Sequence, residues 1–184
     1  MSKAVRAAVL AVVVLAGCSG GGGKQAVAPT TTTVAPSTTA ATPTTQSQEA
    51  QVKQAWDDYW TMIVRLSGSP DGNDAELTTR AVDPLLSFLR DNFSTQAAKG
   101  ERVVIPAGAK YAHQFVSTAI SGETATVKGC QLDDAVTVGA ANEVIDDSVL
   151  SKDIAATFIL KNGNWLAEQV QITSQRQGLV GCGS

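Results

Sequence analysis

Few side chains of this chain could carry out chemistry, and its single histidine is the clearest of them. His113 alternates with Tyr111 and Phe115, so we expect these three side chains to share one face of a strand. An imidazole there can act as a general acid or base, or it can be a structural histidine. One histidine excludes a zinc or iron site built from several histidines. We find no catalytic motif, and we expect no metal and no cofactor.

Paired carboxylates occur three times, at residues 57–58, 133–134 and 146–147. Adjacent residues of a helix do not share a face, and the second and third pairs fall at loop-like positions, so solvated charge is the ordinary explanation. No EF-hand spacing joins them into a calcium site. The net charge of −3 disfavours a nucleic-acid-binding surface.

An aromatic cluster stands near the start of the folded part. Trp56, Tyr59 and Trp60 lie on a stretch with helical spacing. Such a stripe usually belongs to a core, but pockets are also lined by apolar and aromatic side chains. We therefore name Trp56, Tyr59, Trp60 and His113 as candidate pocket residues, with the core as the alternative for the three aromatics.

The N-terminus has the pattern of a secretion signal. A basic start is followed by an apolar run over residues 7–17, which is too short to span a membrane. The run ends in Leu15-Ala16-Gly17-Cys18, which resembles the lipobox of bacterial lipoproteins. The resemblance implies that residues 1–17 are a signal peptide and that Cys18 carries the lipid, with acyl chains such as palmitate. An ordinary secretory signal with a chance cysteine is the alternative.

The other two cysteines are Cys130 and Cys182. Outside the cytoplasm, two remaining cysteines are expected to pair, which would pin the C-terminal tail to the sheet. The rival reading is a metal or redox pair, but the chain has no Cys-x-x-Cys motif and no second histidine to support one.

Residues 18–47 form a predicted tether. The stretch 28–45 consists almost entirely of Thr, Ala, Pro, Val and Ser, without an aromatic or charged residue. It cannot bury enough apolar surface to offset its conformational entropy, so we expect it to be disordered and extended. The folded domain is therefore expected over residues 48–184.

The domain begins with helical patterns and continues with strand patterns. One helix is predicted over residues 48–66, with a capping box of Thr45 and Gln48 and with one apolar face formed by Val52, Trp56, Tyr59, Ile63 and Leu66. Another is predicted from Asp83-Pro84 to Gly100, with Leu85, Phe88, Leu89 and Phe93 at helical spacing. A short helical turn between them, over residues 74–80, is a weaker prediction. Strands are predicted over residues 111–120, 123–132, 153–160 and 165–173, with residues 139–152 as a loop. Helices followed by an antiparallel sheet predict an α+β fold.

This order resembles the nuclear transport factor 2-like fold, a cone-shaped α+β domain shared by polyketide cyclases and many binding domains. More closely, it resembles a group of actinobacterial envelope lipoproteins with a Thr/Pro tether. The shared segments are residues 55–60, residues 122–130, residues 162–166 and Gly181-Cys182. The resemblance covers most of residues 48–184, and its motifs support the fold far more than an activity. It implies helices packed on a curved antiparallel sheet, and it allows a homodimer through that sheet.

Three functions remain open at this stage. The first, which we favour, is a non-catalytic binding or interaction module, lipid-anchored at the extracytoplasmic face of the cell membrane, with an envelope protein as its partner. The second is a carrier or sensor of a small apolar ligand held in the cone. The third is a cyclase- or isomerase-like enzyme that uses His113.

Overall fold

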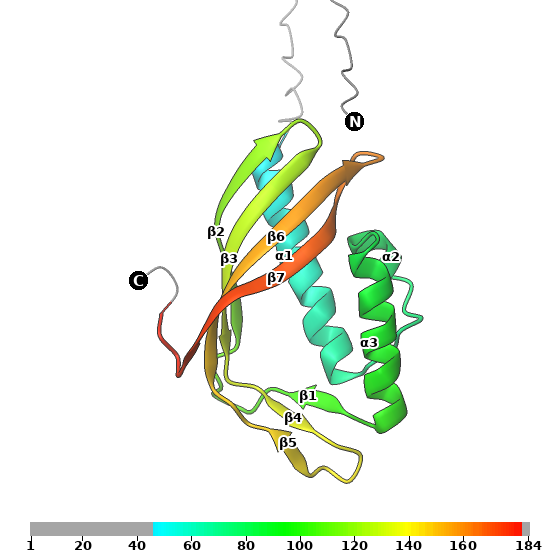
Figure 1. Cartoon of the computed structure of the whole chain (residues 1–184), viewed down its shortest axis with the longest axis vertical. Helices are drawn as coiled ribbons and strands as arrows, with labels where there is room; N and C mark the ends of the chain where they lie inside the picture. The colour runs from blue at the N-terminus through cyan, green and yellow to red at the C-terminus, as the bar shows by residue number, and fades with distance from the viewer. Residues whose placement is uncertain (1–45, 182–184) are drawn as a thin grey trace, which may run out of the picture. The chain divides into compact units, whose positions relative to one another are not determined.

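The computed structural model describes residues 46–181, which form three helices followed by seven strands (Figure 1). The helices are α1 (Gln48–Gly68), α2 (Leu77–Arg80) and α3 (Leu85–Lys99). The strands are β1 (Arg102–Val104), β2 (Ala112–Ser121), β3 (Thr124–Asp133), β4 (Val136–Val138), β5 (Val144–Asp146), β6 (Leu150–Lys161) and β7 (Asn164–Gln177). The predicted signal peptide, Cys18, all but the last two residues of the tether, and Cys182 lie outside the described residues.

Helix α1 is amphipathic, and its buried side chains follow the predicted spacing except at one position, where Met62 is buried and Ile63 is only partly buried. Five are buried against the sheet and neighbouring helices: Val52, Trp56, Tyr59, Met62 and Leu66. The cap differs from the prediction. Ser47 caps the helix, because its side-chain oxygen accepts a hydrogen bond from the Ala50 amide at 3.2 Å.

Helix α3 is held at both ends by the residues that the sequence indicates. The Asp83 carboxylate accepts hydrogen bonds from the Ser87 amide (3.1 Å) and hydroxyl (2.6 Å). Gly100 ends the helix with φ of 69°, a left-handed conformation that favours glycine. Phe88 was expected on the packed face of this helix, but the structure leaves 64% of it exposed.

The strands form two antiparallel sheets. The larger has the order β2-β3-β6-β7, and the smaller has the order β1-β4-β5. The prediction of a loop over residues 139–152 was wrong, because this segment contains β5 and the start of β6. The residues of β5 are all exposed, so no alternation of buried and exposed side chains marks it as a strand.

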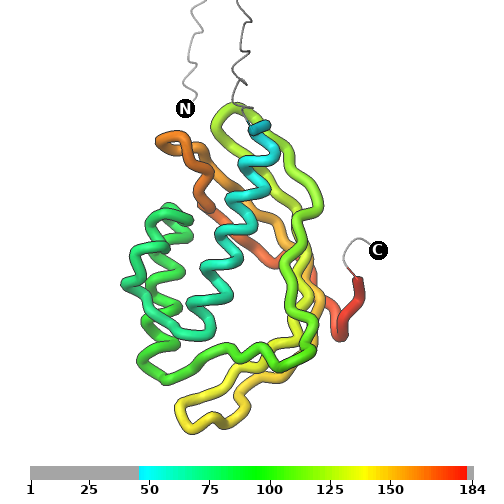
Figure 2. The backbone as a smooth tube through the Cα atoms, turned by 180° about the vertical axis from the view of Figure 1, so that it is seen from behind, coloured from blue at the N-terminus to red at the C-terminus, as the bar shows by residue number. Residues whose placement is uncertain are grey.

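The three helices lie along one face of the larger sheet (Figure 2). Val127, Ala156 and Phe158 project from that face into the core beneath α1. Gly129 continues the row, and a Cβ atom there would lie 2.3 Å from Cη2 of Trp56, so the indole occupies the space of the missing side chain. The domain is thus α+β, with three N-terminal helices packed on antiparallel sheets, while the nuclear transport factor 2-like cone stays a prediction.

Candidate functional site

The four candidate pocket residues come together around Trp60. The indole of Trp60 stacks on the His113 imidazole with a centroid distance of 3.8 Å and an interplanar angle of 13°. Its edge contacts with Trp56 and Tyr59 have centroid distances of 5.5 and 5.2 Å. The four side chains therefore lie in one cluster of ring contacts, and their role in binding a ligand stays a prediction.

Burial divides this cluster into two parts. Trp56 is 0% exposed and Tyr59 is 3% exposed, so both belong to the hydrophobic core. Trp60 and His113 are only partly buried, and they line a cavity of about 410 Å³ together with Tyr111. Val64 of α1 and Ile105, which follows β1, contribute apolar walls. We call this cavity the Trp60 pocket.

Polar side chains continue from the Trp60 pocket along the helix-facing side of the sheet. Strand pairing places His113 opposite Gln131, and Gln131 opposite Lys152. Gln131 donates a hydrogen bond to the Tyr111 hydroxyl at 3.4 Å, and Lys152 Nζ lies 2.5 Å from the Asp133 carboxylate. The inner polar cluster is defined here as Tyr111, His113, Gln131, Asp133 and Lys152.

Sequence reasoning placed Tyr111 on the His113 face but assigned no role to Gln131 or Lys152, and it treated Asp133 as solvated. The alternation of residues along β3 could have identified Gln131 and Asp133. Gln131 and Asp133 continue the alternation of Ala125 and Val127 on β3, so they occupy positions that face the helices. Polar residues at such positions are candidates for a site rather than for the surface.

The two titratable rings of the inner polar cluster are held in their neutral forms. Burial, and then the positive charge of Lys152, lower the pKa of His113 to about 3, so the imidazole is neutral at physiological pH. Its Nε2 atom is buried and has no hydrogen-bond partner among the described residues. Burial, with a smaller effect of the Asp133 charge, raises the pKa of Tyr111 to about 12, so its hydroxyl stays protonated. Within residues 46–181, no group of three His, Cys, Asp or Glu side chains is arranged to hold a metal ion.

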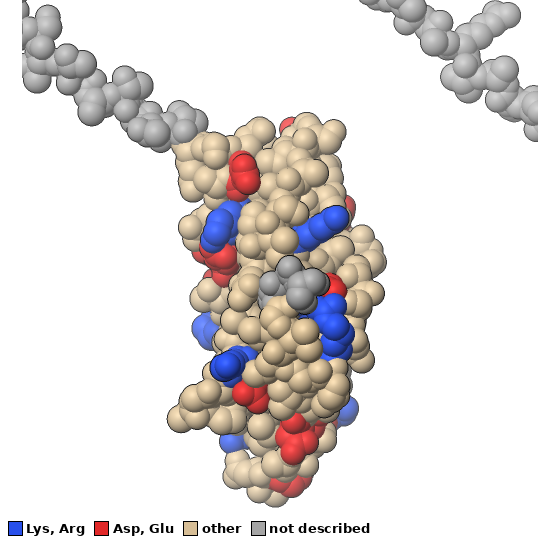
Figure 3. Space-filling model, turned by 90° about the vertical axis from the view of Figure 1, so that its left-hand side faces the viewer, with Lys and Arg blue, Asp and Glu red and all other residues tan. Residues whose placement is uncertain are grey.

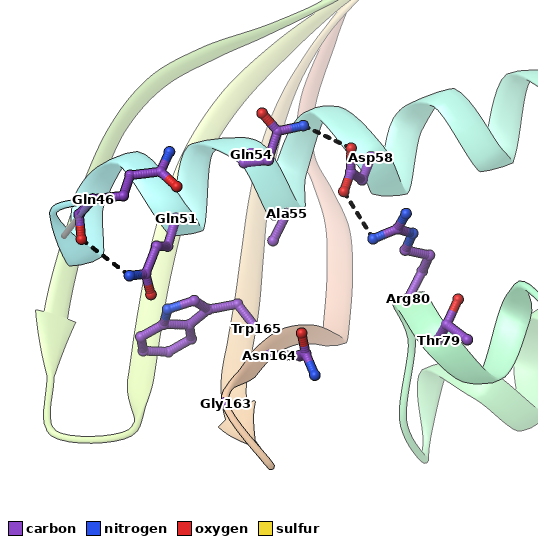
Figure 4. Close-up of a pocket in the computed structure, with 10 residues that line it drawn as sticks. All are labelled: Gln46, Gln51, Gln54, Ala55, Asp58, Thr79, Arg80, Gly163, Asn164 and Trp165. Carbon is purple, nitrogen blue, oxygen red and sulfur yellow. Dashed lines mark hydrogen bonds and ion pairs between the residues drawn. The ribbon is translucent and has the colours of Figure 1, made fainter. Parts of the chain in front are cut away.

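A second, polar cleft lies where α1 begins (Figure 4). Its volume is about 190 Å³, and side-chain amides dominate its walls. We call it the amide cleft, and its polar and aromatic lining residues are Gln46, Gln51, Gln54, Asp58, Thr79, Arg80, Asn164 and Trp165. Sequence reasoning read Asn162 to Leu166 only as a hairpin, and it did not connect that hairpin with α1 or α2.

The cysteine predictions remain open. Cys130 is buried in β3, whereas its predicted partner Cys182 lies outside the described part of the chain, as does Cys18. The Cys130–Cys182 disulfide and the lipidation of Cys18 therefore stay predictions.

Charges of both signs are interspersed on the face shown in Figure 3, and most of that face is uncharged. This face therefore carries no field of one sign that would attract a polyanion. Across residues 46–181, no helix combines the length and the hydropathy that crossing a membrane requires.

No family model matches the chain, and no curated protein sequence matches it. Among solved structures, the crystal structure of the intermembrane space region of the chloroplast protein ARC6 is similar to it, with a TM-score of 0.55 and 12% sequence identity. The match covers 70% of this chain and 98% of the ARC6 chain. An NMR structure of a de novo β-sheet design matches with a TM-score of 0.35 and 12% identity over 71% of this chain and 93% of the design. The ARC6 match shows a shared α+β fold, and the design match carries no further argument.

Proposed function

We propose that this chain is an extracytoplasmic lipoprotein whose folded domain binds an envelope partner or ligand and catalyses no reaction. In this proposal the lipid on Cys18 anchors the chain to the cell membrane, and residues 18–47 space the domain from it. The helices on a curved antiparallel sheet support a nuclear transport factor 2-like cone, as in the actinobacterial envelope lipoproteins that the sequence resembles. The similar ARC6 domain is an intermembrane space region, and this similarity supports a location outside the cytoplasm.

The observation that carries the proposal is the Trp60–His113 stack at the edge of an open cavity. A stacked indole and neutral imidazole give a rigid aromatic wall, and Val64 and Ile105 extend it with apolar surface. Pockets of this kind are mostly apolar, with a few polar groups that orient the ligand. Tyr111 supplies such a group, because its protonated hydroxyl can donate or accept a hydrogen bond.

The electrostatics of His113 support binding over catalysis. A general base works best when its pKa lies near the operating pH, and burial together with Lys152 keeps the pKa of His113 near 3. An enzyme that uses His113 as a base would therefore hold a very weak base. The low pKa of His113 therefore disfavours the cyclase or isomerase alternative.

A carrier or sensor of a small apolar ligand is the second candidate. The size of the Trp60 pocket favours it, because about 410 Å³ lies within the range of small-molecule sites. The core next to it offers no such room, since Trp56 and Phe158 fill the space between α1 and the sheet. Native mass spectrometry and crosslinking distinguish a small ligand in this pocket from an inserted protein side chain.

The test is native mass spectrometry of the full chain, purified in detergent from the membranes of the producing organism. Binding of a small ligand predicts a reproducible extra mass that denaturation removes and that Trp60→Ala abolishes. Phe88→Ala is the matched control, because Phe88 is exposed on α3 and does not line the Trp60 pocket. A protein partner predicts no extra mass, together with a crosslinked protein that Trp60→Ala loses and Phe88→Ala retains. If the wild-type chain shows neither an extra mass nor a crosslinked protein, the proposal is contradicted.

The anchor is tested separately. Cys18→Ala is expected to release the protein from the membrane fraction into the soluble fraction. Retention in the membrane fraction would mean that the lipobox pattern was misread.

A further inference from the structure

We propose that the amide cleft is a second binding site, and that it takes one neutral sugar residue. The cleft shares no lining residue with the Trp60 pocket, so this inference goes beyond the proposed function and does not depend on it.

The walls of the amide cleft offer hydrogen-bond donors and acceptors that suit a sugar. A side-chain amide offers two donor hydrogens and an accepting oxygen, and a sugar hydroxyl both donates and accepts. Gln51 donates one hydrogen bond to the Gln46 carbonyl at 3.0 Å, and Gln54 donates one to Asp58 at 2.8 Å. These bonds orient the two amides, and each amide keeps its carbonyl oxygen and a second N–H hydrogen. Asn164 adds a third amide from the hairpin side of the cleft (Figure 4).

The ionic side chains of the amide cleft are paired with each other. The two ionic groups that line the cleft, Asp58 and Arg80, form an ion pair at 2.8 Å, and the Glu76 carboxylate lies 3.5 Å from the same guanidinium. A carboxylate or phosphate ligand would be repelled by the Asp58 and Glu76 carboxylates, and a cationic ligand would compete with Arg80 for Asp58. A neutral polyhydroxyl ligand can use the outer surfaces of both groups without breaking the pair.

The floor of the amide cleft is aromatic. Trp165 is only 6% exposed, and its indole Nε1 has no hydrogen-bond partner among the described residues. Figure 4 shows the indole beside Gln51, with Asn164 and Gly163 next to it in the chain. The edge of this buried ring forms an apolar floor below polar amide walls, which matches a sugar, since a sugar has an apolar C–H face and polar edges.

The size of the cleft limits the ligand to a single ring. Its volume of about 190 Å³ is below the range of roughly 300–1,000 Å³ that drug-sized ligands occupy. The cleft is also open to solvent at Gln46, Gln54 and Asn164, all of which are exposed. A sugar at the end of a polysaccharide, or a free monosaccharide, can therefore enter it.

The test is saturation-transfer NMR of the full chain in phospholipid nanodiscs. The probes are glucose, galactose, mannose, arabinose and N-acetylglucosamine, with glucuronic acid as the charged comparison. At least one neutral sugar is expected to bind weakly and saturably. The double variant Gln51→Met/Gln54→Met keeps side-chain length but removes both amides, and it is expected to weaken binding about tenfold or more.

Two further variants make the result decisive. Gln114→Met, at an exposed position of β2 outside the cleft, is the matched control and should bind as the wild type does. Asn164→Ala should weaken binding without touching α1, and thermal unfolding checks that each variant folds. A polysaccharide that binds where free sugars do not, with loss in the double variant, would identify a chain end as the ligand. Absence of saturable binding by both the free neutral sugars and the polysaccharide, equal binding by the double variant, or binding of glucuronic acid alone would overturn the proposal.

Discussion

The two halves of the larger sheet use the same strands for opposite purposes. In one half, Ala125 and Val127 of β3 and Phe158 of β6 face α1 and form a closed apolar core. Farther along the same strands, Gln131 and Lys152 occupy the equivalent inward positions. The strand pairing between β3 and β6 is continuous from one half to the other, so only the side-chain chemistry changes.

This difference gives the two halves opposite effects on the stability of the fold. Burial of apolar side chains stabilises the first half, whereas burial of polar and charged groups costs free energy unless they are paired. The inner polar cluster is therefore a region that the fold must tolerate, and the apolar half provides the stability that permits it.

The largest expected effect is in the apolar half. Trp56→Ala removes a fully buried indole that packs on Gly129 and contacts Phe115, and it should lower the free energy of unfolding by about 3–5 kcal/mol. Urea unfolding of the chain measures this. A loss below about 1 kcal/mol would mean that the apolar half does not dominate stability.

The next effect concerns the ion pair of the polar half. Lys152→Met leaves the Asp133 carboxylate, whose side chain is 19% exposed, without its cation, and it should cost about 1–3 kcal/mol. The double variant Lys152→Met/Asp133→Leu removes both charges and should recover most of that loss. If the double variant is as unstable as Lys152→Met, the loss of stability does not come from the unpaired Asp133 carboxylate.

His113 should make stability depend on pH. Its pKa is 6.5 in the unfolded chain and about 3 in the folded one, so the unfolded state binds the extra proton between these values. Stability is full above pH 6.5 and falls as the pH is lowered, by at most about 1.4 kcal/mol per pH unit. His113 is surrounded by the Lys152 charge, the Tyr111 and Trp60 rings, and Gln131, which lies opposite it on β3. Unfolding at about pH 7 and about pH 5 should show a smaller difference in His113→Gln, and identical differences would contradict this account.

The smallest effect is expected for an exposed ion pair. Lys53 and Asp57 pair along α1 at 2.6 Å, with side chains 55% and 44% exposed. Lys53→Ala should change the free energy of unfolding by less than about 0.5 kcal/mol. The contrast with Lys152→Met, measured in the same urea experiment, isolates the effect of burial on a lysine–aspartate pair. An equal loss of unfolding free energy in Lys53→Ala and Lys152→Met would contradict the expected effect of burial.

The elements with a clear period could be predicted from the sequence. The spacing of Val52, Trp56, Tyr59 and Leu66 identified α1, and the alternation in residues 153–160 identified β6. Strands β1, β4 and β5 were missed because each has only three residues, too few to establish an alternation.

The candidate sites were only partly predictable for a different reason. Trp60 and His113 stood out by residue type, but their stacking depends on how α1 packs across β2. The inner polar cluster draws on β2, β3 and β6, and Gln131 and Lys152 meet only because the strands pair in one register. The amide cleft joins the start of α1 to Arg80 and to the β6–β7 hairpin, which no local pattern links.

The Ser47 cap has a mechanical consequence. If residues 18–47 tether the domain to a membrane, any tension on that tether enters the fold at Ser47 and is carried by the first turn of α1. The hydrogen bonds from Ala50 to Ser47 and from Gln51 to Gln46 are then the first to bear the load. A ligand in the amide cleft would bridge this turn to the β6–β7 hairpin, so occupancy of the cleft and resistance of α1 to unravelling under force would rise together.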